Sequence, residues 1–388
     1  MAETIRIKKG LDIPLAGRLS NDVSDDVSDD TLSIDFALVP DDFPGIKWRA
    51  VVSTGDEVKV GSKIMEDKGG SPISLVSPVA GKITDVIRGE RRKIEAVTLV
   101  RESDSRVDLT TDFSNEKQVR ETLQRCGLWA LMRQRPYDII PAADALFRDV
   151  FVTAFDSAPL APEIVTPDMY EDIEEGLRIL AMLTEGKVYL GTAFGSGITS
   201  AHADVIEYQG PHPAGNVGVQ IAQICPVNKG ETVLTLDART TARIGHLSLH
   251  GKLDTRCEVG ITGPEAKHPK TIRTTIGAAI KDLVKDNIIG GKNERIISGN
   301  VLTGIILTGD LFQQLVGGNI ERLYFNAGIL LHEGIGDLGD TGGNRIDGYL
   351  ALFLRLLVQF LIGLIRVEDT GGLSPLAQLE RARCRCLI

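Results

Sequence analysis

Two histidines of this 388-residue chain have a spacing that suits metal chemistry. His246 and His250 are separated by the i, i+4 interval of paired metal ligands on a helix. The segment that contains them, HLSLHG, alternates in the manner of a β-strand, which also places both imidazoles on one face. No HExxH glutamate is present, and no carboxylate beside them in the sequence supplies a third ligand. The sequence therefore predicts no metal site and favours two hydrogen-bonded structural histidines.

A glycine-rich stretch, Gly191-x-x-x-Gly195-x-Gly197, follows a strand-like segment. A dinucleotide-binding loop needs GxGxxG at the start of a helix and an acidic residue about 20 positions further on. Here Ser200 stands at the third glycine position, and the next residues return to a strand pattern. A surface turn is therefore favoured over a nucleotide site. The chain also has no GxxxxGK[ST] phosphate loop and no GxSxG elbow, so we predict no catalytic residue.

Lys68 ends the sequence EDK inside residues 51–99, where one pattern occurs twice: short β-branched runs that reach glycine turns such as Gly61 and Gly81. Strands this short bury a core by closing on one another, which predicts a small barrel of the lipoyl/biotinyl type. Such barrels often present a lysine that carries a swinging arm. The interval between Gly61 and Lys68 is shorter than in carrier hairpins, and no Met-Lys-Met is present. A carrier that uses Lys68 stays open as an alternative function.

Charge and cysteine content exclude several classes of function. The net charge of -10 argues against a nucleic-acid partner, because binding phosphates needs a basic face. The five cysteines are scattered, so neither a disulfide framework nor an iron–sulfur cluster motif is present, and a reducing cytoplasm fits.

The acidic segment 20–30 lacks the spacing of a calcium loop and predicts a solvated loop. The apolar segment 349–365 is too short and too interrupted for a membrane span and predicts a buried or interfacial helix.

Strand and helix signals alternate through the middle third of the chain, which predicts an open α/β sheet. A second unit, all-β or α+β, follows from Leu247 to Ile297. The fold class is therefore an α/β multidomain protein with a barrel-sandwich domain near its start.

Several stretches resemble one family and occur in that family's order. They are IKKGLDIPLAG (7–17), VSTGDEVKVGSKIMEDK (52–68), SPVAGKITDVIRGERRKI (77–94), GLWALMRQRPYD (127–138), VFVTAFDSAPLAP (150–162), GPHPAG (210–215), IGHL (244–247) and RIISGNVLTG (295–304). Together they are similar to the A subunit of the sodium-translocating NADH:quinone oxidoreductases (the Na+-NQR complexes), over about residues 5–304.

The resemblance implies an architecture. It consists of an N-terminal strand and acidic loop (1–35), a lipoyl-like barrel-sandwich domain (36–103), a Rossmann-like α/β domain (104–255) and a β-grasp domain of the SLBB kind (256–304). From residue 305 to 388 the chain departs from the family and ends in RARCRC. We expect this tail to reflect a truncation or a change of reading frame.

The resemblance also implies a role. The chain is expected to be a peripheral protein on the cytoplasmic face of the bacterial inner membrane, beside the B subunit of the complex, and to reach the membrane only through that complex. The complex couples electron transfer from NADH to quinone with Na+ export. The chain is expected to support quinone reduction without a flavin, an iron–sulfur cluster or any covalently bound cofactor of its own. A purely structural scaffold is the remaining alternative.

Four side chains in the matching stretches are expected to contact ubiquinone: Arg135, Tyr137, Phe155 and His212. A quinone site needs an apolar cleft with a few convergent polar groups, and these residues supply both kinds of surface. His212 stands between two prolines, which hold it in a stiff, extended loop of the kind that faces ligands or partners.

Overall fold

The computed structural model describes residues 3–19, 28–29, 35–284, 287–289, 294–307 and 322–327. The chain divides into two units, Met1–Gly328 and Ile329–Ile388, and every described residue belongs to the first unit. No helix within the described ranges is long and apolar enough to cross a bilayer. Outside those ranges lie the apolar segment 349–365, most of the acidic segment 20–30, and most of the expected tail, namely 308–321 and 328–388.

The barrel-sandwich domain is built from short strands in two sheets, ordered β3-β9-β8-β5 and β4-β6-β7. Their bounds are β3 Asp35–Leu38, β4 Trp48–Ala50, β5 Glu57–Val58, β6 Lys63–Asp67, β7 Ser74–Val76, β8 Ala80–Arg88 and β9 Ile94–Ser103. Ile64, Ile83 and Leu99 are almost fully buried, because alternate residues along each strand point to the same side. The small barrel predicted from the repeated strand pattern is confirmed.

Gly81 lies inside β8, so the turn predicted at this position is wrong. It pairs with Arg101 of β9 at an irregularity of the strand ladder. A Cβ atom at position 81 would lie 1.8 Å from the backbone oxygen of Val100. Glycine is needed here for the close approach of two strands, whereas Gly61, with φ 89°, occupies a turn as predicted.

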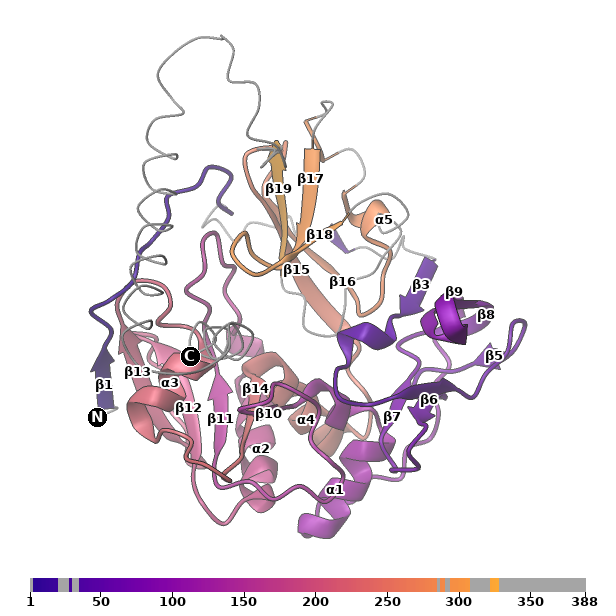
Figure 1. Ribbon diagram of the computed structural model, residues 1–388, viewed down its shortest axis with the longest axis horizontal. Coiled ribbons are helices and arrows are strands. Elements are labelled where there is room, and N and C mark those ends of the chain that lie inside the picture. Colours follow the sequence, from indigo (N-terminus) through magenta and orange to yellow (C-terminus); the bar gives the residue numbers. More distant parts are fainter. Residues whose placement is uncertain are drawn as a thin grey trace, which may run out of the picture. The chain divides into compact units, whose positions relative to one another are not determined.

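The α/β domain contains a six-stranded sheet ordered β1-β13-β12-β11-β14-β10 (Figure 1). Its strands are β1 Glu3–Arg6, β10 Arg133–Arg135, β11 Val150–Thr153, β12 Val188–Ala193, β13 Asp204–Gln209 and β14 Val233–Asp237. Within this sheet β10 is antiparallel to β14, and the other pairings are parallel. The open α/β sheet predicted from alternating signals is confirmed. The N-terminal strand β1 adds to its edge beside β13, which the sequence did not indicate.

Four α-helices belong to the described part of this domain: α1 Glu116–Arg125, α2 Tyr170–Leu180, α3 Val217–Ile224 and α4 Ala238–His250. The strand pattern around His246 is a wrong prediction, because these residues form the last turns of α4. Both ends of α4 have strong helix signals. The Asp237 side chain accepts a hydrogen bond from the Thr240 amide, and Gly251 ends the helix with φ 64°. These caps outweigh the short alternation of the HLSLH segment.

The third domain is a mixed sheet ordered β18-β17-β19-β15-β16-β2, with helix α5 (Ile280–Val284) packed against it. Its strands are β2 Ser28–Asp29, β15 Arg256–Thr262, β16 Lys270–Thr275, β17 Glu294–Ser298, β18 Ile305–Leu307 and β19 Arg322–Ala327. Val259, Ile261 and Ile280 form its core. The second unit predicted from Leu247 onward is present as a mixture of strands and a helix, but it begins after α4, which contains Leu247.

Asp42 lies where the barrel domain meets the α/β domain. The guanidinium of Arg133 donates a hydrogen bond of 3.0 Å to the backbone oxygen of Asp42. Burial, together with the neighbouring charge of Asp41, raises the pKa of the Asp42 carboxyl from 3.8 to about 6, although Arg133 acts in the opposite direction. The carboxylate therefore opposes folding at neutral pH.

We expect Asp42→Asn to raise the free energy of unfolding at pH 7.5 by about 1–3 kcal/mol. In the folded state the wild-type carboxyl is protonated below a pH of about 6, whereas in the unfolded state it is protonated only below pH 3.8. Its destabilising effect therefore grows as pH rises through that window and is absent at lower pH. Urea unfolding between pH 4 and pH 8 measures the difference. Asp104→Asn is the control, because Asp104 is an exposed carboxylate that does not contribute to the raised pKa of Asp42. A gain that is constant across this pH range would contradict the assignment.

Candidate functional site

The order of the strands identifies where a ligand would bind the α/β sheet. From β11 the chain continues through β12 and β13 on one side, whereas β14 lies on the other side of β11. Open α/β sheets bind ligands beyond the carboxyl ends of their strands at such a switch point. At the end of β14, the carboxylate of Asp237 is engaged as the cap of α4, accepting from the Thr240 amide at 2.6 Å. The loop 154–162, which follows β11, is therefore the candidate ligand-facing segment.

The loop GPHPAG (210–215) follows β13 and is fixed against the N-terminal segment. The Leu11 amide donates to the backbone oxygen of His212 at 2.9 Å, and the His212 amide donates to Asp12 Oδ1 at 3.0 Å. A Cβ atom on Gly10 would lie 2.0 Å from the backbone oxygen of His212, and the φ of Gly10 is 153°. Only glycine allows this approach. Residues 200 positions apart therefore hold one rigid loop at the carboxyl edge of the sheet.

Phe155 and His212 both lie at this carboxyl edge. His212 Nδ1 is 3.0 Å from Ser157 Oγ, which also accepts a hydrogen bond of 2.8 Å from the Gly215 amide. Phe155 stacks on Tyr208, with ring centroids 6.2 Å apart and an interplanar angle of 23°. Burial raises the pKa of the Tyr208 hydroxyl, which stays neutral. The structure thus brings two of the four predicted residues to one edge that combines aromatic surface with an oriented imidazole.

Arg135 and Tyr137 lie elsewhere. Arg135 pairs with Val233 at the amino end of β14. Since β14 runs parallel to β11, this is the end of the sheet opposite to Phe155. The Arg135 guanidinium forms an ion pair of 3.3 Å with Asp138, and Tyr137 is 68% exposed. The four predicted residues therefore form two separate groups.

Gly191 lies buried inside β12, so the surface turn predicted for the glycine stretch is wrong at this position. The rest of the stretch, residues 194–197, follows β12 and not the switch-point strand β11. Gly195 and Gly197 have φ values of 77° and 71° and lie in an exposed turn, as predicted. The loop after β11 contains no glycine between residues 154 and 162. A dinucleotide fingerprint would be expected after the first strand of the unit. The glycine stretch therefore does not coincide with the loop at the switch point. That the chain binds no dinucleotide remains a prediction.

Lys68 is exposed in the turn between β6 and β7, and its amide donates to the backbone oxygen of Lys47 at 2.7 Å. It borders a groove of about 510 Å³ that is strongly basic. The other basic residues of this groove are Lys47, Arg49, Arg88, Arg91, Arg92 and Lys93. Lys68 is thus one cation among several.

An apolar cavity of about 70 Å³ is lined by residues that include Leu38, Leu75, Cys126, Leu131 and Leu253. An apolar cavity known to bind benzene measures about 150 Å³. The cavity is therefore too small for the ring of a quinone. Burial raises the pKa of the Cys126 thiol, which keeps this wall of the cavity uncharged.

One group of side chains was missed by the sequence reasoning. Asp172 of α2 lies beside His246 and His250 of α4, although 74 residues separate it from His246. The i, i+4 spacing of the histidines was the visible signal. Their carboxylate partner lies on another helix, and nothing in the local sequence indicates that these two helices touch.

Comparison with known proteins gives three family models that match in order along the chain. The NqrA N-terminal barrel-sandwich hybrid domain matches residues 5–102, the NqrA second alpha/beta domain matches 114–253, and the NQRA C-terminal domain matches 259–309. These matches coincide with the barrel, the α/β sheet and the third, mixed sheet described above.

Curated relatives agree with these matches. The A subunit of the Na(+)-translocating NADH-quinone reductase of Shewanella frigidimarina (strain NCIMB 400) is 35% identical over 308 residues, which are 77% of this chain and 68% of that protein. Its counterpart in Histophilus somni (strain 2336) is 35% identical over 311 residues, 77% of this chain and 69% of that protein. That of Neisseria meningitidis serogroup A (strain DSM 15465 / Z2491) is 35% identical over 317 residues, covering 79% and 70%.

The fold and these similarities define a three-domain component of an NADH-quinone reductase. The chain belongs to the NqrA family, the A subunits of the Na+-translocating NADH-quinone reductases, as the ordered motifs predicted.

Proposed function

We propose that this chain acts as the NqrA component of a Na+-translocating NADH-quinone reductase, the complex that transfers electrons from NADH to quinone and exports Na+. The observation that carries the proposal is the ordered match of three NqrA domain models together with relatives 35% identical over more than three quarters of the chain. Within that complex the chain supports quinone reduction and holds no flavin or iron–sulfur cluster of its own.

The carboxyl edge of the α/β sheet is the position we propose for the quinone headgroup. Phe155 offers an aromatic face, and His212 is oriented by Ser157. Because Ser157 Oγ already accepts from the Gly215 amide, its own hydroxyl hydrogen is available for His212 Nδ1. In the tautomer in which Ser157 donates to Nδ1, the imidazole proton is on Nε2, where it can donate to a quinone carbonyl. Arg135 and Tyr137, at the opposite end of the sheet, mark a second and separate position to test.

Photolabelling of the full chain with a ubiquinone analogue tests this placement. We expect Phe155→Ala and His212→Ala each to reduce specific labelling about tenfold, which is the effect of losing about 1.4 kcal/mol of binding. Tyr137→Ala is the matched control, because it removes an aromatic ring at the far end of the sheet. Labelling lost only in the Tyr137 and Arg135 variants would move the site to that end. Labelling no stronger than on denatured chain would reject quinone binding and leave the scaffold role.

We further propose that the chain docks against the B subunit of the complex at the cytoplasmic face of the inner membrane and reaches the membrane only through the complex. Family membership supports association with the other components. Co-purification of the tagged chain with those components tests this proposal, and recovery of the chain alone would contradict it.

The carrier alternative is not favoured by the family. An added acyl mass on Lys68 in intact-mass spectrometry would restore it.

A further inference from the structure

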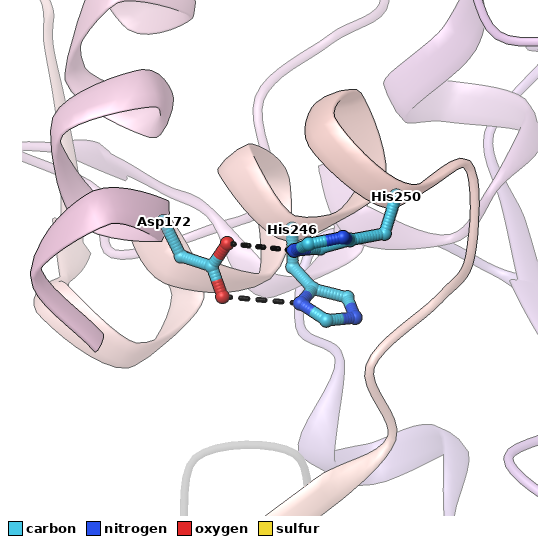
Figure 2. A group of neighbouring side chains, drawn as sticks. All are labelled: Asp172, His246 and His250. Atoms are coloured by element: carbon cyan, nitrogen blue, oxygen red, sulfur yellow. Dashed lines mark hydrogen bonds and ion pairs between the residues drawn. The ribbon is translucent and has the colours of Figure 1, made fainter. Parts of the chain in front are cut away.

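Helices α2 and α4 cross at unusually short range. A Cβ atom on Gly245 would lie 1.8 Å from the backbone oxygen of Asp172, and one on Gly176 would lie 2.1 Å from the backbone oxygen of Thr241. Two glycines therefore let the helix backbones touch. As a consequence, the short side chain of Asp172 reaches the face of α4 that carries the two histidines (Figure 2).

The donor atoms of Asp172, His246 and His250 converge. His246 Nδ1 lies 3.0 Å from Asp172 Oδ2, and His250 Nε2 lies 3.6 Å from Asp172 Oδ1. One donor atom from each residue lies within 4.8 Å of the other two. Donors bound tetrahedrally to zinc at about 2.0–2.1 Å are about 3.4 Å apart. The side chains therefore need only small rotations to surround one ion.

The three side chains are partly exposed, so a metal ion could reach them from solvent. The His246 and Asp172 side chains are 20% and 19% exposed, and His250 is 51% exposed. The imidazole ring centroids are 4.3 Å apart. Arg256, which lies outside the two helices, interacts electrostatically with Asp172 and is itself paired with Asp254 at 2.8 Å. Three protein donors with one open, solvent-facing position are a known arrangement for zinc.

We propose that Asp172, His246 and His250 bind a divalent transition-metal ion of the zinc type, which ties α2 to α4. Two imidazoles and one carboxylate select zinc, cobalt or nickel over magnesium or calcium, since the latter two ions require mostly oxygen donors. The i, i+4 histidine pair supplies two ligands from one helix face, and Asp172 supplies the bond between the helices.

Titration of the full-length, untagged, chelator-treated chain with Co2+, and then with Zn2+ against a chromophoric chelator, tests the proposal. We expect one equivalent of Co2+ to give the intense visible bands of a four-coordinate site, and Zn2+ to displace it. His246→Gln and His250→Gln are each expected to weaken binding on the order of 100-fold, because each removes a direct ligand. Zn2+ is also expected to raise the melting temperature of the wild type and not that of the double variant.

His268→Gln is the matched control, because His268 is an exposed histidine of the third domain. It is expected to leave the cobalt spectrum unchanged. His250 ends α4 and is half exposed, so His250→Gln removes a ligand without disturbing the core. Equal affinity and identical spectra in the wild type and in the His246→Gln/His250→Gln double variant would overturn the proposal. The three residues would then form a hydrogen-bonded ion pair between the helices.

Discussion

Gly245→Ala is expected to lower the free energy of unfolding of the α/β domain by about 3 kcal/mol. The added methyl group would meet the backbone oxygen of Asp172 at 1.8 Å and the amide nitrogen of Gly176 at 2.8 Å. Backbone atoms cannot rotate aside as a side chain can, so α2 and α4 must separate. The intrinsic preference of alanine for helices, about 1 kcal/mol, offsets only part of this cost. The same separation should weaken the contact between Asp172 and His246.

Urea unfolding followed by tryptophan fluorescence measures the effect. The chain has two tryptophans, and Trp129 is fully buried in the α/β domain. A Trp48→Phe background therefore makes the signal specific for that domain. Leu249→Ala is the control on the same helix, because Leu249 is 44% exposed and its loss should change stability by less than about 0.5 kcal/mol. A Gly245→Ala chain as stable as the wild type would show that the helices do not touch at this position.

Arg239→Met is expected to have a similar or larger effect, about 3–5 kcal/mol. The Arg239 side chain donates hydrogen bonds to the backbone oxygens of Ile164, Glu163 and Glu258, at 3.0, 3.0 and 3.2 Å. It is 8% exposed and also pairs with the Glu258 carboxylate at 3.7 Å. Methionine fills a similar volume but leaves three carbonyls without this donor, whereas the Glu258 carboxylate keeps its ion pair with Arg273 at 3.0 Å.

The location of Arg239 gives this prediction a second readout. The residue links α4 to the loop before α2 and to β15 of the third domain, so its loss should expose that loop to proteases. Limited proteolysis alongside urea unfolding checks both effects. Lys187→Met is the control, because Lys187 pairs with Asp204 at the surface of the same domain, with 65% and 54% of the two side chains exposed. Such pairs contribute at most about 1 kcal/mol. Equal losses in both variants would contradict a special role for Arg239.

Much of the fold was predictable, because its signals are local. Glycine turns such as Gly61, and the alternation of strand and helix in the middle third, depend on a few adjacent residues. The ordered motifs predicted the family in the same way. The prediction was wrong where two local signals competed: alternation around His246 favoured a strand, whereas the caps at Asp237 and Gly251 make it the end of a helix.

The candidate sites were less predictable, because they depend on which strands and helices become neighbours. Phe155 and His212 lie at the same edge only because β11, β12 and β13 are parallel strands of one sheet, while Arg135 lies at the other end because β10 is antiparallel. Asp172 reaches His246 only because two glycines allow α2 and α4 to touch.

The sequence by itself determined the three-domain class, the family and the i, i+4 histidine pair, because periodicity, turn residues and motif order are properties of neighbouring residues. The tertiary structure decided which side chains share a site. Side-chain proximity across 74 residues, as between Asp172 and His246, arises from backbone packing, and no local pattern in the chain specifies it.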